Sequence, residues 1–130
     1  MNGVDRLRFD ANGLVPAVVQ DVNTAEVLML GFMNRAALER TIESGKVTFW
    51  SRSRQNFWVK GETSGHFLNL RGLYVNCELN SLLVKAEPIG PTCHEGYNSC
   101  YFRELPVDGG DLEVVAERLM LPDEIYGAAR

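Results

Sequence analysis

Residues 14–32 read LVPAVVQDVNTAEVLMLGF, and this stretch decides the fold class. Leu14 to Val22 and Glu26 to Phe32 are rich in Val and Leu, and the polar pair Asn23-Thr24 separates them. Two such runs around a short polar break predict two strands that pair as a hairpin. Pro16 has no backbone N–H to donate, so it belongs either on an edge strand or near the start of the first strand.

A helix is expected directly after this hairpin. Asn34 is a favoured N-cap, and Gly45 can end the helix in a left-handed conformation. Further strands are expected at residues 46–50, 67–76, 82–88 and 99–105. A second helix is expected from Leu112 to about Leu121, with Asp111 as its cap and Pro122 ending it. Together they predict an α+β fold class with mainly antiparallel strands, one internal helix and a C-terminal helix, in a single domain over residues 1–130.

The composition is that of an ordinary soluble domain. Of the 130 residues, 45% are hydrophobic and 23% are charged, and the net charge of -4 argues against a general nucleic-acid binder. No apolar run reaches the roughly 20 residues that a membrane span needs. The N-terminal stretch MNGVDRLRFD does not have the pattern of a secretory signal, and three cysteines cannot all pair with one another. We therefore expect a cytoplasmic protein whose thiols stay reduced.

The first segment with chemical potential is WSRSR, residues 50–54. On an extended chain alternate side chains share a face, so Arg52 and Arg54 are expected on one side, and Ser51 and Ser53 on the other. Two guanidinium groups on one side suit bidentate contacts to phosphate, and a local basic cluster in an acidic protein favours a small anionic ligand. The alternative is a solvated face on an edge strand.

The second segment is KGETSGH, residues 60–66. Its small and glycine residues let backbone N–H groups approach a ligand, and Lys60 adds positive charge. The residues that could contact a phosphate here are Lys60, Gly61, Glu62, Thr63, Ser64 and Gly65. A glycine-rich turn between strands is the simpler interpretation. His66 is a possible proton carrier, ligand contact or buried core group.

Two segments contain the three cysteines. In NCELN, side-chain oxygens of Asn76, Glu78 and Asn80 alternate around Cys77, which suits a hard cation such as Mg2+ on an extended chain, whereas an Asn-rich turn explains the same residues. In CHEGYNSC, Cys93 and His94 precede Cys100 at a spacing longer than a zinc finger uses. Three thiolates can hold zinc and leave its fourth position open for water, although free cysteines are often merely small buried hydrophobes.

Taken together and in this order, these segments resemble phosphoribosyl-AMP cyclohydrolase of histidine biosynthesis. The residues that carry the resemblance read LMLGFMNRAALERTIESGKVTFWSRSR at 28–54, WVKGETSGH at 58–66 and CHEGYNSCYFR at 93–103. The match runs from about residue 26 to residue 104. The combination of WSRSR, KGETSG and CH followed by a cysteine after five further residues is highly specific.

The resemblance implies a zinc-dependent enzyme that hydrolyses the N1–C6 bond of the adenine ring in N1-(5-phosphoribosyl)-AMP and opens the purine to a formimino-carboxamide ribotide. It also implies an intertwined homodimer in which Cys93 and Cys100 of one subunit and Cys77 of the other hold the zinc. His94, beside a ligand, is then the expected general base, with His66 as the second choice. Segments 51–54 and 60–65 would bind the two phosphates of this substrate.

One departure from the family pattern concerns magnesium. The family usually has three alternating aspartates around the upstream cysteine, associated with Mg2+, where this chain has Asn76, Glu78 and Asn80. Affinity for a hard cation depends on carboxylate count, so Mg2+ binding is expected to be weakened, displaced or absent. Two other interpretations stay open: a related hydrolase or deaminase acting on another purine nucleotide, and a non-catalytic module with a structural zinc whose fourth ligand is His94 or His66.

Overall fold

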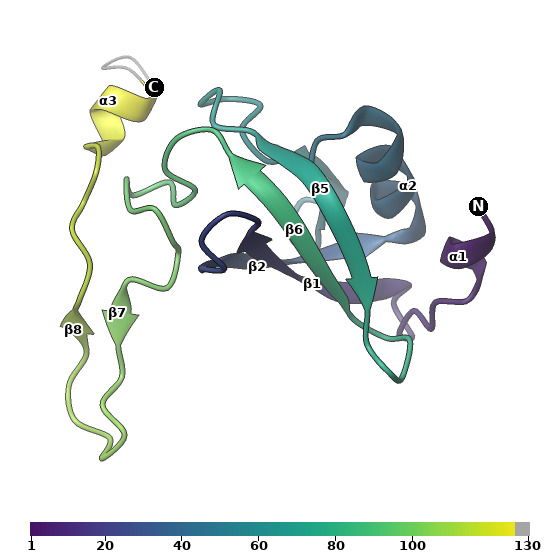
Figure 1. The fold of residues 1–130 in the computed structure, drawn as a ribbon, viewed down its shortest axis with the longest axis horizontal. Helices are drawn as coiled ribbons and strands as arrows, with labels where there is room; N and C mark the ends of the chain where they lie inside the picture. Colours follow the sequence, from purple (N-terminus) through teal and green to yellow (C-terminus); the bar gives the residue numbers. More distant parts are fainter. Residues whose placement is uncertain (127–130) are drawn as a thin grey trace.

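The computed structural model describes residues 1–126, and residues 127–130 lie outside it. Its elements in chain order are α1 (Asn2–Asp5), β1 (Leu14–Asp21), β2 (Val27–Asn34), α2 (Arg35–Ser44), β3 (Thr48–Ser51), β4 (Asn56–Val59), β5 (Leu68–Val75), β6 (Leu82–Pro88), β7 (Arg103–Glu104), β8 (Glu113–Val114) and α3 (Pro122–Tyr126). A four-stranded sheet stands at the centre of Figure 1, with β7, β8 and α3 beside it.

The central sheet has the strand order β2-β1-β6-β5. Its β1–β2 and β5–β6 pairs are antiparallel, and β1 and β6 run parallel. The predicted hairpin at residues 14–32 and the α+β class with mainly antiparallel strands are thereby confirmed. Because β1 lies between two partners, Pro16 is not on an edge strand. It stands near the start of β1, and pairing with β6 begins only at Ala17.

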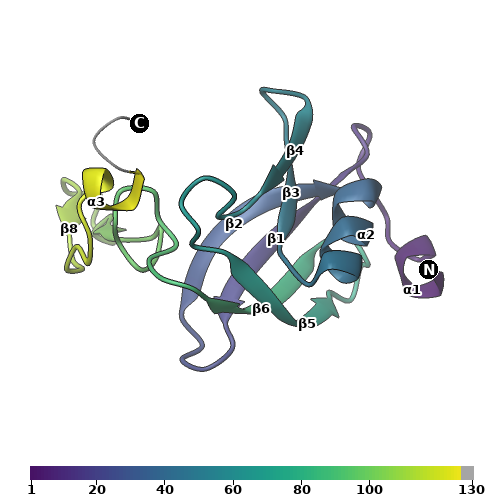
Figure 2. The same cartoon turned by 90° about the horizontal axis from the view of Figure 1, so that it is seen from above.

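The core lies on one face of this sheet. Side chains alternate along β1, where Ala17 and Val19 are fully buried and Val18 and Gln20 are half-buried. Figure 2 shows α2 and the β3–β4 hairpin on the same side of the sheet, and Leu38 of α2 belongs to the same buried cluster as Val19. The opposite face carries no such cover within residues 1–126 in either ribbon view.

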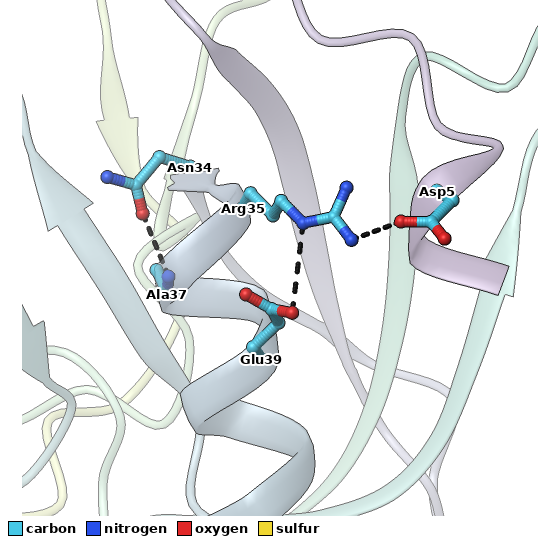
Figure 3. Close-up of polar contacts among 5 residues, drawn as sticks. All are labelled: Asp5, Asn34, Arg35, Ala37 and Glu39. Carbon is cyan, nitrogen blue, oxygen red and sulfur yellow. Dashed lines mark hydrogen bonds and ion pairs between the residues drawn. The ribbon is translucent and has the colours of Figure 1, made fainter. Parts of the chain in front are cut away.

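The internal helix is capped as its sequence predicts. The Asn34 side chain accepts a hydrogen bond of 2.8 Å from the Ala37 N–H, and Gly45 follows the last turn at a φ of 73°. Figure 3 shows Arg35 reaching from the first turn of α2 both to Glu39 and to Asp5 of α1. The cap fixes where the helix begins, and Arg35 ties the N-terminal turn to it.

The β3–β4 hairpin crosses β2 at a position that has room only for glycine. A Cβ atom on Gly31 would lie 2.4 Å from a ring carbon of Phe49, and Phe49 is itself only 1% exposed. The ring therefore packs directly on the β2 backbone. This contact places β4, and the loop that follows it, against the central sheet.

The predicted helix at Leu112 to Leu121 is wrong. Residues 112–121 are extended, with the short strand β8 paired to β7, and they are joined to the preceding segment by backbone bonds. The Val115 N–H donates to the Phe102 carbonyl and the Leu119 N–H to the Gly96 carbonyl, instead of to carbonyls four residues earlier. The adjacent β-branched Val114 and Val115 favour this conformation. Of the strand predicted at residues 99–105, only Arg103 and Glu104 form a strand, which is β7.

Pro122 begins a helix instead of ending one. It is the first residue of α3, where its missing N–H costs nothing and its fixed φ suits the helix. Glu124, three residues after Leu121, accepts a hydrogen bond of 3.0 Å from the Leu121 N–H, as in one half of a capping box. None of the helices in residues 1–126 has the length and apolarity that a membrane span requires.

We expect Gly31→Ala to destabilise the protein, because its new methyl group would overlap the buried Phe49 ring. Overpacking of this kind costs about 1–3 kcal/mol of unfolding free energy, measurable by urea denaturation. The matched control is Gly3→Ala, where a Cβ meets nothing within 4 Å and the change should stay within about 0.5 kcal/mol. Equal stabilities of the two variants would contradict the packing described here.

Candidate active site

A pocket of about 280 Å³ lies where four parts of the chain meet. They are β2, the β3–β4 hairpin, the loop after β4 and the segment that follows β6, with α3 at the rim. The lining residues are Met29, Arg54, Trp58, Lys60, Gly61, Glu62, Thr63, Ser64, His94, Cys100 and Tyr126. The pocket therefore combines cationic groups, hydroxyl groups, an imidazole and a thiol, which is a chemistry suited to a phosphorylated substrate.

The structure gathers eight of the residues that the sequence singled out around this pocket. Those that line the pocket are Arg54, Lys60, Gly61, Glu62, Thr63, Ser64, His94 and Cys100. Those that do not are Ser51, Arg52, Ser53, Gly65, His66, Asn76, Cys77, Glu78, Asn80 and Cys93. Met29, Trp58 and Tyr126 also line the pocket, although none of them had been assigned a role from the sequence. Trp58 lies on β4, two positions before Lys60, and an expected strand at this place would have put the two side chains on one face. No signal in the sequence pointed to Tyr126.

The expected alternation of WSRSR is wrong, because residues 52–55 form the turn of the β3–β4 hairpin. The strand β4 that follows was not anticipated. The turn separates the two guanidinium groups: Arg52 stacks 4.0 Å from the centre of the Phe32 ring, whereas Arg54 lines the pocket. The hydroxyl of Ser51 accepts a hydrogen bond of 3.3 Å from the Arg54 N–H, which holds the turn closed.

The loop after β4 uses its glycines for its own folding. Gly61 has a φ of 94°, and a Cβ there would lie 2.5 Å from the backbone of His66 and Phe67. The Gly65 N–H closes the loop by donating to the Gly61 carbonyl at 2.7 Å. His66 packs against Gly90, where a Cβ would lie 2.8 Å from the imidazole, and its buried Nδ1 makes no hydrogen bond within the described chain.

The segment after β6 folds back on itself and brings two cysteines together. The Cys93 N–H donates to the Tyr97 carbonyl at 3.0 Å, and the Gly96 N–H donates to the Cys93 carbonyl at 2.9 Å. At the end of this loop the Cys100 N–H donates to the Leu28 carbonyl of β2 at 2.8 Å. The loop therefore places buried Cys93 beside Cys100 at the pocket wall.

The two thiols and Lys60 influence one another electrostatically. Burial of its sulfur first, and then the neighbouring Cys93, raise the pKa of Cys100 to about 11, while Lys60 opposes this shift. The residue as a whole is exposed, so this burial is crowding of the sulfur by protein atoms. Burial also lowers the pKa of Lys60, which the two thiols counteract. The Cys100 thiol is thus reluctant to ionise, and a metal ion bound to its sulfur would offset that cost.

The third cysteine lies elsewhere on the chain. Cys77 is exposed in the turn between β5 and β6, whereas Cys93 and Cys100 follow the far end of β6 (Figure 1). The seven residues of β6, which lie between Cys77 and the other two cysteines, span about 20 Å at roughly 3.3 Å per residue. Within residues 1–126, no three His, Cys, Asp or Glu side chains come together in a metal-binding arrangement.

The NCELN segment is a turn, as the alternative interpretation of its asparagines predicted. The Asn76 side-chain oxygen accepts hydrogen bonds from the Asn80 and Ser81 N–H groups at 2.9 and 3.0 Å. Its amide nitrogen donates to the Asn80 side chain at 2.6 Å, and Leu79 takes a φ of 62°. An extended arrangement with 76, 78 and 80 on one face is therefore wrong for this segment.

Residues 29–102 match the family model described as phosphoribosyl-AMP cyclohydrolase, which is more than half of the chain. The chain belongs to the phosphoribosyl-AMP cyclohydrolase family. The resemblance based on the WSRSR, KGETSGH and CHEGYNSC segments, and the class of enzyme it implied, are confirmed. All three cysteines and every pocket-lining residue except Tyr126 lie within the matched segment.

Individual phosphoribosyl-AMP cyclohydrolases match almost the full chain. The protein of that name from Pelotomaculum thermopropionicum is 48% identical over 124 residues, which cover 95% of each chain. The one from Methanococcoides burtonii is 45% identical over 126 residues, covering 97% of this chain and all of its own. The one from Methanosarcina barkeri is 50% identical over 122 residues, covering 91% of each chain.

Proposed function

We propose that this chain hydrolyses the N1–C6 bond of the adenine ring of N1-(5-phosphoribosyl)-AMP in histidine biosynthesis, with zinc held by Cys93 and Cys100 of one copy and Cys77 of a second. The observation that carries the proposal is the pairing of Cys93 and Cys100 beside a pocket that also contains Arg54, Lys60 and His94. Membership of the family supports the substrate, and the donor set supports the metal.

The residues present fit a zinc ion only if a second copy takes part. One chain brings together two thiols, which is fewer than the three protein ligands of a catalytic zinc site. Cys77 is exposed and free to serve as the third ligand of another copy. His94 does not join Cys93 and Cys100 in a three-ligand cluster, so a closed structural site has no support in the described part of the chain. Zinc, when bound, acidifies water and acts as a Lewis acid.

Apolar surfaces flank both halves of this divided site and support the homodimer. Beside Cys100, large apolar side chains of the segment 101–121 are more than half exposed: Tyr101, Leu105, Val107, Leu112, Val114, Val115, Leu119 and Leu121. Near Cys77, Val18, Leu30, Tyr74 and Leu83 form one cross-strand row on the uncovered face of the sheet, with Tyr74 54% exposed. A two-fold dimer uses each surface twice, and burying them is favourable.

The pocket residues have distinct roles in the proposed reaction. Arg54 and the loop at 61–65 bind the phosphates and hold the adenine ring over the pocket. The imidazole of His94 takes a proton from the water that attacks C6, and returns it to N1 as the C6–N1 bond breaks. His66 is the weaker candidate, because its side chain packs against Gly90 and does not line the pocket.

Magnesium has little support in this chain. The Asn76 and Asn80 side chains bond each other, and the Asn76 side chain also accepts from backbone N–H groups of its own turn. Glu78 is then the single carboxylate among the three positions at which the family has aspartates. Because carboxylates dominate the affinity for hard cations, we propose that Mg2+ binding at this turn is weakened, displaced or lost.

The purified protein should open the ring of N1-(5-phosphoribosyl)-AMP and should not act on AMP or adenosine, which can be followed by the absorbance of the product.

Metal analysis should find about one zinc per chain, and adding Mg2+ to zinc-loaded enzyme should change turnover less than about twofold. Turnover of AMP instead would favour a different purine substrate. Zinc without turnover of any of these compounds would favour a non-catalytic module.

We expect His94→Ala to retain zinc and to lose about 100-fold or more in kcat, because loss of a general base has this effect. The matched control is His66→Ala, which should keep kcat within a few-fold because this imidazole lies outside the pocket. Loss of zinc from His94→Ala would show that this histidine is a ligand. A large kcat loss in His66→Ala alone would transfer the role of base to His66.

The divided site predicts complementation between two inactive variants. Cys77→Ser and Cys93→Ser should each be inactive, because each breaks both sites of a dimer. A mixed dimer keeps one intact site, with Cys77 from one chain and Cys93 and Cys100 from the other. Refolding the two variants together at equal amounts should restore about a quarter of wild-type activity, since half of the dimers are mixed. No recovery, with dimers present, would rule out the shared site.

A further inference from the structure

Lys60 is the buried cationic residue of the described chain. It is 7% exposed, and its backbone N–H donates to the Val47 carbonyl at 3.1 Å, which fixes it at the base of the β3–β4 hairpin. The other two lysines are more exposed: Lys46 reaches the Asn69 side chain, and Lys85 lies over the Tyr74 ring. A buried ammonium group is costly unless an anion is close to it.

No carboxylate among residues 1–126 fills that role. The ion pairs of the described chain join Arg35 to Asp5 and Glu39, and Arg71 to Glu87. Lys60 lines the same pocket as Cys100, and the centre of the Trp58 ring lies 5.7 Å from its Nζ. Cys100 and Cys93 are the groups that act on its charge electrostatically. The groups beside Lys60 that would become anionic on binding a metal ion are therefore the sulfurs of the two paired cysteines.

We propose that Lys60 is a positioning residue for the metal centre, in which its ammonium group offsets the negative charge of the Cys93 and Cys100 thiolates. The proposal rests on the zinc site of the proposed function. Three thiolates on one zinc ion carry a net charge of -1, so a cation held beside two of them by the fold stabilises the loaded site. Groups around metal ligands commonly contribute 10–100-fold to metal affinity.

This role differs from a phosphate contact, which KGETSGH suggested for Lys60. Removal of a phosphate-binding lysine raises the KM, because the lysine acts as a point charge on the substrate. Lys60 lines the pocket but is only 7% exposed, whereas Arg54 of the same pocket is exposed and better placed for a phosphate. The two roles predict opposite results: loss of zinc affinity with KM retained, or loss of substrate affinity with zinc retained.

The test compares Lys60→Met with Lys60→Arg in the purified full chain at one fixed pH. Zinc affinity is measured by competition with a chromophoric chelator, and the KM in the presence of excess zinc. Lys60→Met, which keeps the length of the side chain but not its charge, should bind zinc about 10–100-fold more weakly, with KM changed only a few-fold. Lys60→Arg, which keeps the charge, should stay within about threefold of wild type.

A second neutral variant, Lys60→Gln, guards against a folding defect in Lys60→Met, and circular dichroism verifies both. Unchanged zinc affinity in a folded neutral variant, or equal weakening in Lys60→Arg, would overturn the proposal. A neutral variant with a raised KM and unchanged zinc affinity would also overturn the proposal, and would show that Lys60 binds a phosphate of the substrate. Failure of the wild-type protein to hold zinc at all would instead refute the proposed function, so the two failures are distinguishable.

Discussion

The hydrogen bond from the Cys100 N–H to the Leu28 carbonyl joins the segment after β6 to the outer strand of the sheet. The accepting carbonyl lies on β2, and among residues 1–126 its pairing with β1 alone holds β2 in the sheet. With this bond in place, the pocket forms between Met29 on β2, the Lys60 loop and His94. Together with the hydrogen bond of 2.7 Å that the Ser99 hydroxyl donates to the Val27 carbonyl, the Cys100 bond fixes the loop that carries two cysteines relative to the basic residues. The site is therefore a product of contacts between segments far apart in the chain.

The elements predicted well from the sequence are those whose local signals agree with their surroundings. The hairpin at 14–32, the cap at Asn34 and the strand at 82–88 have patterns that the sheet reinforces. The helix expected at 112–121 had apolar spacing and a capping aspartate in its favour. Its amide groups bond instead to the Gly96 and Phe102 carbonyls, and a contact of that kind is invisible to any local pattern.

The chemistry-bearing residues were recognisable, but their arrangement was not. The motifs contain most of the pocket lining, and yet WSRSR is a turn that separates Arg52 from Arg54. Gly61 of KGETSG lets the loop pack closely on its own backbone, and the sequence motif alone does not distinguish this role from phosphate binding. Likewise, the burial of Lys60 depends on Trp58 and on a loop more than thirty positions later. Sequence spacing identifies which groups are present, whereas tertiary contacts decide which of them can meet.

The parallel β1–β6 pair has a consequence for the order of events during synthesis. More than sixty residues separate the two strands, so the hairpin at 14–34 leaves the ribosome long before its neighbour exists. The sheet closes only once Pro88 has emerged, and the apolar segment 101–121 is made later still. A nascent chain therefore completes its own sheet before it displays the apolar side chains of the segment 101–121, which shortens the time that this segment is exposed on the polysome.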